Sequence, residues 1–359
     1  MTILDIPQMR LKNQGISDRR FKTVKEVVSW MGAMQAQDYN ASLWAIGLRM
    51  AGNPKVADIE KAISKGEIIR LWPMRGTIHF VAAEDARWMH SLLTPRLNNT
   101  YNDRSDRLGI TPEIIKQSKD LFTKALKGNK HLTREALYQI LEKAGIKTAN
   151  SIGLHITYRL AHEGLIVCGP REGKQQTLAL FDEWVPKGKE FSREEAIKEL
   201  TLRYFTSHGP AQIKDLNWWS GLPIKDIKRG IELNGKKLTK ETIEGKDYYF
   251  SALEIRPIRS IRNSQSAFLL PAFDEYIVAY RDRDAVLESV HKEKINPGGN
   301  GMLQPVVVIN GQVLGNWKKV IKKSTVEVVT VPFVSFGTDG NVSIKIASEQ
   351  YNFFNKLTS

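Results

Sequence analysis

The stretch "HLTREALYQILEKAG" (residues 131–145) carries the pattern of a short amphipathic helix, with Thr133 as an N-cap candidate and Gly145 as a stop. The next stretch, "SIGLHITYRLAHEGLIVCGPREGKQQTLALF" (151–181), begins as a second helix and continues as two apolar, strand-like runs. The polar residues 170–176 separate the two runs and predict a turn. Helix, turn, helix and hairpin in this order predict a winged helix.

The same order of elements occurs twice more in the chain. One copy starts at Ser192 and ends in a strand pair around a turn at 244–246. Another starts near Thr23 and ends in the apolar stretch "EIIRLWPMRGTIHFV" (67–81), which is interrupted at Arg75. We therefore expect three winged-helix modules, at residues 1–95, 110–188 and 190–254.

The residues after the third module have a different character. They contain β-rich runs such as "PVVVINGQVLGNW" (305–317) and only a little helical pattern near the end. The sequence "INGQ" (309–312) between two apolar runs predicts a β-hairpin, because Asn-Gly adopts the positive φ angles that a tight turn requires. The expected fold class is α+β, with tandem winged-helix modules followed by a C-terminal antiparallel β-rich domain at residues 255–359.

Composition and charge favour a protein that binds a polyanion. The chain has 359 residues, with 53 Lys and Arg against 39 Asp and Glu, for a formal net charge of +14. Such an excess attracts nucleic acid, and a winged helix usually contacts the grooves and backbone of DNA. We expect the partner to be duplex DNA, bound largely without regard to sequence. The alternative is that the modules serve as joints between proteins.

Other classes of protein fit the sequence less well. No apolar run approaches the roughly 18 residues of a membrane span, and the stretch 1–15 lacks the apolar core of a signal peptide. The single cysteine, Cys168, argues against disulfides and thiolate zinc sites and suits a reducing compartment. We expect a cytoplasmic, nucleoid-associated monomer with no membrane contact, no metal and no cofactor.

A pair of glutamines stands where a helical run gives way to polar residues. In "MGAMQAQDYNA" (31–41), Gln35 and Gln37 are separated by one alanine. They are either polar residues at a frayed helix end or two amides directed at one reacting atom. Residues two apart share a face only in extended backbone, so the pair can converge only if the helix ends near Met34. Asp38 is an alternative base, and it would point away if both glutamines point in.

Basic residues on turns and hairpins are candidate DNA contacts. At the tip of the middle hairpin, Arg171 and Lys174 either contact phosphates or form a solvated turn. Arg75, in the break of the first hairpin, is a further candidate. His79 alternates with Thr77 on one strand face and is also a candidate, with structural and catalytic roles as the alternatives.

A dense group of charges lies in the C-terminal part of the chain. The stretch "LLPAFDEYIVAYRDRD" (269–284) places four carboxylates next to Arg281 and Arg283, which are two further candidate DNA contacts. Carboxylates at this density either take part in acid–base catalysis or form a salt-bridged turn. The four are Asp274, Glu275, Asp282 and Asp284.

On these motifs the chain resembles the bacterial winged-helix DNA glycosylases of the AlkZ and YcaQ type over nearly its whole length. The resemblance rests on "QAQD" (35–38), "MRGTIHFV" (74–81), "LLPAFDEYIVAYRDR" (269–283) and "PVVVINGQVLGNWKK" (305–319). It implies a monofunctional glycosylase that removes alkylated guanine and unhooks interstrand crosslinks. The first motif resembles the catalytic Gln-apolar-Gln motif of that family, which implies catalytic roles for Gln35 and Gln37.

The details of this motif bear on the reaction. Another branch of the family has Asp in place of the second Gln, so Gln37 after a small alanine resembles the crosslink-type branch more closely. The implied reaction is hydrolysis of the N-glycosidic bond of a cationic N7-alkylated purine. The competing interpretation is a non-enzymatic winged-helix DNA-binding protein or transcriptional regulator. A regulator normally carries a dimerisation helix or an effector pocket, and neither is evident in the sequence.

Overall fold

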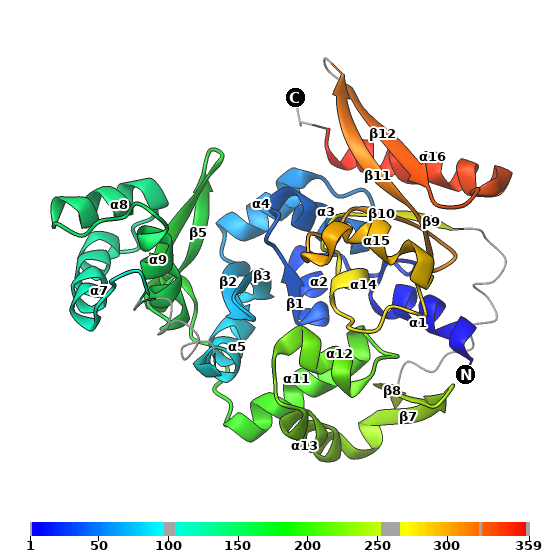
Figure 1. Cartoon of the computed structure of the whole chain (residues 1–359), viewed down its shortest axis with the longest axis horizontal. Coiled ribbons are helices and arrows are strands. Elements are labelled where there is room, and N and C mark those ends of the chain that lie inside the picture. The colour runs from blue at the N-terminus through cyan, green and yellow to red at the C-terminus, as the bar shows by residue number, and fades with distance from the viewer. Residues whose placement is uncertain (1, 97–104, 106, 253–265, 323–324, 357–359) are drawn as a thin grey trace. The chain divides into compact units, whose positions relative to one another are not determined.

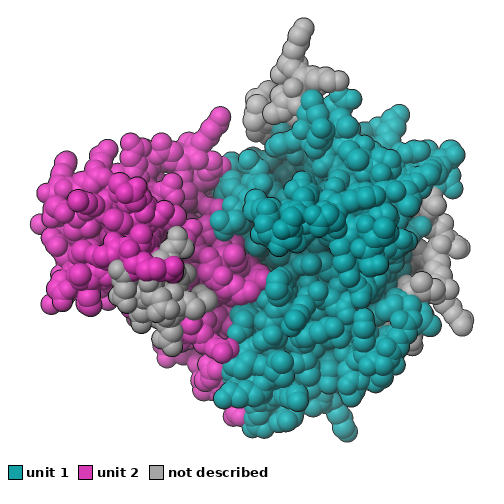
Figure 2. Space-filling view, viewed as in Figure 1, with its two compact units in different colours: residues 1–60, 197–359 teal, residues 61–196 magenta. Residues whose placement is uncertain are grey.

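The computed structural model describes residues 2–96, 105, 107–252, 266–322 and 325–356. The chain forms two compact units: unit 1 consists of residues 1–60 and 197–359, and unit 2 consists of residues 61–196 (Figure 2). Their boundaries fall inside helices α4 (Val56–Ser64) and α11 (Arg193–Ser207). The first expected module is therefore divided between the units, and the module limits remain a prediction.

Unit 2 contains the winged helix expected from residues 131–181. Thr133 caps α8 by accepting a hydrogen bond from the Ala136 N–H at 3.2 Å, and Gly145 follows that helix at a φ of 81°. The predicted helices and hairpin are confirmed. In chain order the elements are α7 (Pro112–Leu126), β4 (Leu132–Thr133), α8 (Arg134–Lys143), α9 (Ile152–His162), β5 (Ile166–Glu172) and β6 (Gln175–Leu180) (Figure 1).

A second hairpin extends the sheet of unit 2. Strands β2 (Ile68–Met74) and β3 (Thr77–Ala82) are antiparallel, and β2 pairs with β5, which gives the order β3-β2-β5-β6-β4. Arg75 and Gly76 both have positive φ and form the turn, so the break expected there is confirmed. The short helices of this unit are η2 (Ala83–Asp85), α5 (Ala86–Leu93) and α10 (Phe181–Trp184).

Unit 1 repeats the order helix, strand, helix, helix at its N-terminal end. It begins with η1 (Ile3–Asp5) and α1 (Ile6–Asn13), followed by α2 (Val24–Met31), β1 (Ala33–Gln35), α3 (Tyr39–Arg49) and the first part of α4. The third copy consists of α11, α12 (Ile213–Ser220), α13 (Ile224–Asn234), η3 (Gly235–Lys237) and the antiparallel pair β7 (Leu238–Ile243) and β8 (Lys246–Ser251). Its hairpin turn lies at Glu244 and Gly245, as expected.

The C-terminal part of unit 1 contains an antiparallel sheet in the order β12-β11-β10-β9. Asn310 and Gly311, with φ of 50° and 84°, form the tight turn between β10 and β11, which confirms the predicted hairpin. The strands are β9 (Ala267–Leu270), β10 (Val306–Ile309), β11 (Gln312–Lys322) and β12 (Thr325–Pro332). The helices before β10 are short: α14 (Glu275–Val278), η6 (Ser289–His291), α15 (Lys292–Ile295) and η7 (Pro297–Gly299).

The expectation of only a little helix near the end is wrong, because α16 (Gly337–Phe354) has 18 residues. Glycine, serine and β-branched residues give this segment a weak intrinsic helical tendency. Its stability comes from packing, which sequence propensity does not report. The rings of Tyr351 and Phe354 lie 5.2 and 5.1 Å from that of Trp44 on α3, and Figure 1 shows α16 alongside the sheet.

The described elements are helices and antiparallel strands, so the α+β class is confirmed. Within the described part of the chain, no helix combines the length and the apolar character needed to cross a membrane.

Candidate active site

The two glutamines lie just after the end of helix α2. A capping box at Thr23 and Glu26 begins this helix, and Gly32, at a φ of 76°, ends it after Met31. The following residues are extended in β1, which meets the condition that the helix end before the glutamines. Ala36 is buried, whereas Gln35 is half-buried and Gln37 is exposed. Gln35 and Gln37 are thus both more exposed than the alanine between them.

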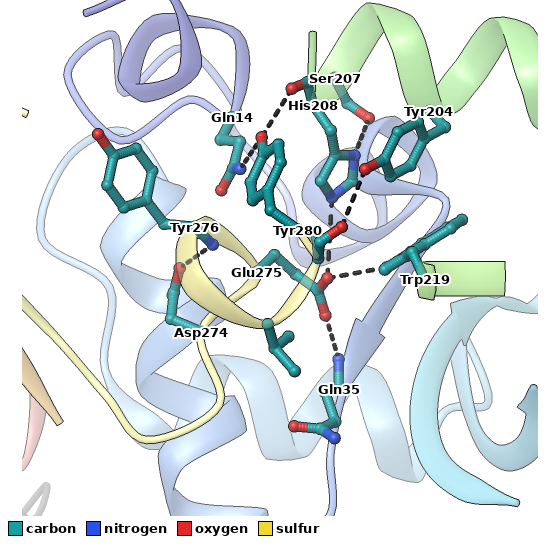
Figure 3. A network of polar contacts seen from close by, with 12 residues as sticks. Gln14, Gln35, Tyr204, Ser207, His208, Trp219, Asp274, Glu275, Tyr276 and Tyr280 are labelled. Carbon is teal, nitrogen blue, oxygen red and sulfur yellow. Dashed lines mark hydrogen bonds and ion pairs between the residues drawn. The ribbon is translucent and has the colours of Figure 1, made fainter. Parts of the chain in front are cut away.

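Gln35 combines a fixed backbone with a side-chain oxygen that no described residue satisfies. Its backbone N–H donates to Oε1 of Glu275 at 2.7 Å (Figure 3). Its own Oε1 is buried and has no hydrogen-bond partner among the described residues. Buried polar atoms are nearly always paired, so an orphaned acceptor is a site where a water or a ligand can bind.

The neighbouring Asp38 has a structural role. Its Oδ1 accepts from the Ala41 N–H at 3.0 Å, which makes Asp38 the N-cap of α3. The N-cap bond satisfies an amide at the start of the helix that has no partner within it. A proton-transfer role for Asp38 would therefore compete with the start of α3.

Glu275 is the centre of a buried polar network in unit 1. The side chain is 1% exposed, and Oε2 accepts from Trp219 Nε1 at 2.9 Å. His208 Nε2 lies 3.8 Å from the same oxygen, which is too long for a hydrogen bond. Burial lowers the pKa of His208 even though the nearby carboxylate of Glu275 acts in the opposite direction. The neutral form of His208 is therefore favoured.

Asp274, next to Glu275, belongs to a second buried pair. Both of its oxygens accept from the guanidinium of Arg49 at 2.8 Å, and both side chains are fully buried. Arg49 also donates to Gln14 Oε1 at 2.8 Å, and Asp274 Oδ1 caps α14 by accepting from the Tyr276 N–H at 2.9 Å. Phe273, just before Asp274, has a φ of 60°, which is costly for an aromatic residue. The pair thus holds the entry to α14 in one conformation.

The other two carboxylates of this stretch form ion pairs. Asp282 contacts Lys214 Nζ at 3.1 Å and Lys246 Nζ at 2.9 Å, and Asp284 contacts Lys292 Nζ at 2.8 Å. Burial alone would raise the pKa of Asp282, but its bonds to Lys246 and Lys214 hold that pKa below the ordinary value. The salt-bridged turn is therefore the observed arrangement for these two residues.

The candidate DNA contacts differ in their exposure. Lys174 and Arg281 are exposed, whereas Arg171 is half-exposed and its Nη2 donates to the Lys174 carbonyl at 2.5 Å. Arg75 is half-buried in its turn. Arg283 is half-buried, and its Nε donates to the Ile277 carbonyl at 2.8 Å.

His79 is the least suited of the candidate contacts. It is fully buried, and its Nδ1 lies 3.0 Å from the Thr77 carbonyl. A side chain with no exposed surface cannot reach a phosphate without a rearrangement of its strand. The burial favours the structural alternative for this histidine over the DNA contact.

A cavity of about 850 Å³ in unit 1 is lined mostly by residues that were not selected from the sequence. Its walls include Asp38, Asn40 and Ala41 at the N-terminal end of α3, and three buried aromatic side chains. In the sequence, the two lysines that follow Trp317 are the feature that could have indicated this cavity. The aromatic residues are Trp44, Trp317 and Tyr351, and the exposed lysines on the wall are Lys318, Lys319 and Lys356.

Comparisons with known proteins identify the family and the fold of the chain. The sequence model of the family described as "DNA glycosylase AlkZ-like" matches residues 28–348. The "Interstrand DNA cross-link repair glycosylase" of Streptomyces sahachiroi is 23% identical over 338 residues, which cover 90% of this chain and 88% of that protein. The solved structure of the Streptomyces sahachiroi DNA glycosylase AlkZ has the same fold, with a TM-score of 0.79 at 21% identity over 99% of this chain and 96% of that chain. The family match includes both glutamines and Glu275, and the chain belongs to the AlkZ-like DNA glycosylase family.

Proposed function

We propose that the protein hydrolyses the N-glycosidic bond of cationic N7-alkylated purines in duplex DNA, including purines joined in an interstrand crosslink. Membership of a DNA glycosylase family supports the reaction class. The name of the Streptomyces relative, an interstrand cross-link repair glycosylase, supports the crosslink as a substrate. The choice of a cationic purine rests on the chemistry of the glutamine pair.

The leaving group decides how much help the reaction needs. Cleavage of an ordinary glycosidic bond requires an acid for the leaving group and a carboxylate beside the oxocarbenium-like sugar. A purine alkylated at N7 already carries a positive charge and leaves as a neutral base. The protein then has to hold a water at the sugar and to present oxygen dipoles to the developing cation. Amide carbonyls do both without titrating, and oriented dipoles are effective in a site that excludes water.

The observation that carries the proposal is the orphaned Oε1 of Gln35. This oxygen is buried and accepts no hydrogen bond from the described residues, while the backbone of the same residue is anchored to Glu275. A water bound there would donate one hydrogen to the amide oxygen and keep a lone pair for the sugar. Gln37, two residues further along the chain, would complete the position of that water. We assign the reaction to these two amides rather than to Asp38, which caps α3.

The substrate test uses two matched duplexes, one with a single N7-methylguanine and one with a single uracil at the same position. We expect abasic sites, detected by alkaline strand cleavage, only in the first duplex, because uracil is uncharged in the nucleotide, leaves as an anion unless it is protonated, and so needs more assistance. A third duplex, crosslinked through guanine N7 atoms, should be unhooked to single strands on a denaturing gel. No abasic sites in the methylated duplex, or equal cleavage of the uracil duplex, would contradict the proposal.

A further inference from the structure

We infer that Glu275 is a positioning residue for the reaction: its buried carboxylate fixes the backbone N–H of Gln35 and so sets the direction of the Gln35 amide. The inference rests on the proposed function. The contact joins residues 240 positions apart in the chain, at 2.7 Å. Figure 3 shows the Glu275 side chain extending from α14 toward the end of β1, where Gln35 lies.

The carboxylate is held on both of its oxygens. Oε1 receives the Gln35 N–H, and Oε2 receives Trp219 Nε1–H from α12 at 2.9 Å. A buried carboxylate is costly unless such donors replace its water. With both oxygens bonded and the side chain 1% exposed, Glu275 has little freedom to rotate. The position of Gln35 therefore depends on a group that is itself fixed.

His208 does not compete for this carboxylate. Ser207 Oγ donates its single proton to the Arg203 carbonyl at 2.8 Å, so it accepts from His208 Nδ1 at 2.8 Å. The hydrogen-bond network thus assigns the proton of the neutral ring to Nδ1. Nε2 is then a bare acceptor, 3.8 Å from Glu275 Oε2, without a hydrogen-bond partner among the described residues. The Gln35 amide and the Trp219 indole therefore donate to Glu275 without competition from this histidine.

The residue before Glu275 fixes the helix that carries it. The Arg49–Asp274 pair and the cap on the Tyr276 N–H lock the first turn of α14, following a backbone at Phe273 with positive φ. Such a conformation persists only where the surroundings over-determine it. The rigid chain of contacts runs from α3 through Asp274 to Glu275, and from Glu275 to Gln35.

Rigid placement matters because the amide has to hold a water in line with the sugar carbon. A displacement of about 1 Å in a catalytic group can slow a reaction by up to a hundredfold. The side chain of Gln35 is directed by its own backbone, and the backbone has its N–H bonded to Glu275. A shift of that N–H would move the amide oxygen away from the reacting atom without removing any group that binds DNA.

Two substitutions separate the reach of the side chain from its charge. Glu275→Asp keeps the charge but shortens the side chain by one carbon–carbon bond, about 1.5 Å, which takes the carboxylate out of hydrogen-bond range of the Gln35 N–H. Glu275→Gln keeps the reach: its amide oxygen can still accept from the Gln35 N–H, while its amide nitrogen takes the place of Oε2, where it faces the bare Nε2 of His208 and loses the bond from Trp219 Nε1–H. The matched control is Asp85→Asn in unit 2, because Asp85 is also a buried carboxylate that accepts from an indole, Trp88 Nε1, at 2.9 Å.

The measurements are the single-turnover excision rate of N7-methylguanine at saturating protein, the Kd for the same duplex, and amide hydrogen exchange over residues 33–37. Glu275→Asp should lose on the order of tenfold to a hundredfold in rate with Kd changed by less than about twofold. Its exchange at 33–37 should be faster than in wild type. Glu275→Gln should be closer to wild type in both rate and exchange, and Asp85→Asn should change neither beyond about twofold, within the scatter of sites that do not touch the motif.

The possible outcomes separate this inference from the proposed function. If the wild-type protein excises no N7-methylguanine, both the proposed function and the inference are wrong. If the wild type is active, two results would overturn the inference alone: Glu275→Asp is as active as wild type, or Glu275→Gln is slower than Glu275→Asp. Neither result is expected if shortening the side chain is what breaks the contact with Gln35. If Glu275→Asp fails to fold, Glu275→Gln decides: wild-type exchange at 33–37 and a near wild-type rate support the inference, and a rate as low as that of Gln35→Ala overturns it.

Discussion

At the scale of single residues, Arg49 and Asp274 form the most completely buried ion pair of the described structure, with both side chains fully buried. We expect Arg49→Met to lower the free energy of unfolding by about 3–5 kcal/mol, because it leaves the charge of Asp274 buried without its partner. The double variant Arg49→Met with Asp274→Asn should be more stable than Arg49→Met alone, since Asn removes the charge and still caps a helix. Urea unfolding of the three proteins measures both effects.

If Arg49→Met lowers the free energy of unfolding by less than about 1 kcal/mol, water or a rearrangement of the structure compensates the charge of Asp274. The Arg49–Asp274 pair would then not be the rigid support of Glu275. The double variant is the internal control. A double variant as unstable as the single one would mean that packing of the Arg49 side chain, rather than its charge, carries the stability.

Sequence reasoning at this scale succeeds for local motifs and fails for distant partners. The helix end before the glutamine pair, the N-cap at Thr133 and the Asn310–Gly311 turn follow from neighbours in the chain, because capping and turn formation are local. The bond from Glu275 to Gln35 spans 240 positions, and no local rule indicates it. The dense carboxylates of 269–284 were visible as a group, but their separate roles depend on which donors the fold brings to each.

At the scale of elements, the tip of the β5–β6 hairpin is the sharpest test of DNA contact. Arg171→Ala combined with Lys174→Ala should weaken binding to all duplex sequences alike, because phosphate contacts carry no sequence information. The free energy of unfolding should change by less than about 0.5 kcal/mol, since Lys174 is exposed and Arg171 is half-exposed at the tip of a hairpin turn. Fluorescence anisotropy with two unrelated duplexes measures the binding. An unchanged Kd for both duplexes would show that this tip is a solvated turn that does not contact DNA.

Helix α9 contributes a pH dependence to the stability of unit 2. Burial lowers the pKa of His162 from 6.5 to about 4, although the bond to the Tyr158 carbonyl acts in the opposite direction. The unfolded chain takes up this proton near pH 6.5 and the folded protein only near pH 4. Stability from this group is therefore fully present above pH 6.5 and is lost as the pH falls toward 4.

The variant His162→Asn tests this dependence, because its amide nitrogen can replace Nδ1 as the donor to the Tyr158 carbonyl. Between pH 6 and 4.5 the slope of unfolding free energy against pH should decrease by at most about 1.4 kcal/mol per pH unit, the contribution of one proton. Urea unfolding at several pH values measures the slope. A slope equal to that of wild type would assign the acid sensitivity to other groups, such as His90, whose pKa burial also lowers.

Element prediction works where pattern and propensity agree and fails where packing overrides propensity. The helices and the hairpin between 131 and 181 have clear caps, stops and apolar periods, and the structure has them. Helix α16 has glycines near its start and little propensity, but Ile344, Ala347, Tyr351 and Phe354 are buried along it. Partners such as Trp44, on a helix 300 residues away, cannot be read from the segment itself.

At the scale of the whole molecule, the net charge of +14 should dominate the affinity for DNA. The logarithm of the binding constant should fall linearly with the logarithm of salt concentration, with a slope of about −0.9 for each phosphate contacted. The double variant at Arg171 and Lys174 should reduce the magnitude of this slope by about one for each lost contact. Titrations between low and moderate salt measure it. A binding constant that does not depend on salt concentration would show that the net charge does not dominate the affinity for DNA.

The organisation of the whole chain was only partly predictable. The repeated order of helices followed by a hairpin follows from local patterns. The compact units do not, because unit 1 joins residues 1–60 to 197–359, and such a union depends on long-range burial rather than on neighbours in sequence. The cavity beside Asp38 likewise combines residues from both ends of unit 1.

The central claim is that Gln35 and Gln37 carry the hydrolysis, and single-turnover excision of N7-methylguanine by Gln35→Ala and Gln37→Ala tests it most directly. Each variant should be slower than wild type by on the order of tenfold to a thousandfold, the range for loss of one preorganised polar group, with the Kd for DNA nearly unchanged. Gln37→Glu should retain part of the activity, because it keeps the shape while adding a charge. If both alanine variants excise at the wild-type rate, the pair is a polar helix end, and a non-enzymatic DNA-binding protein becomes the better account.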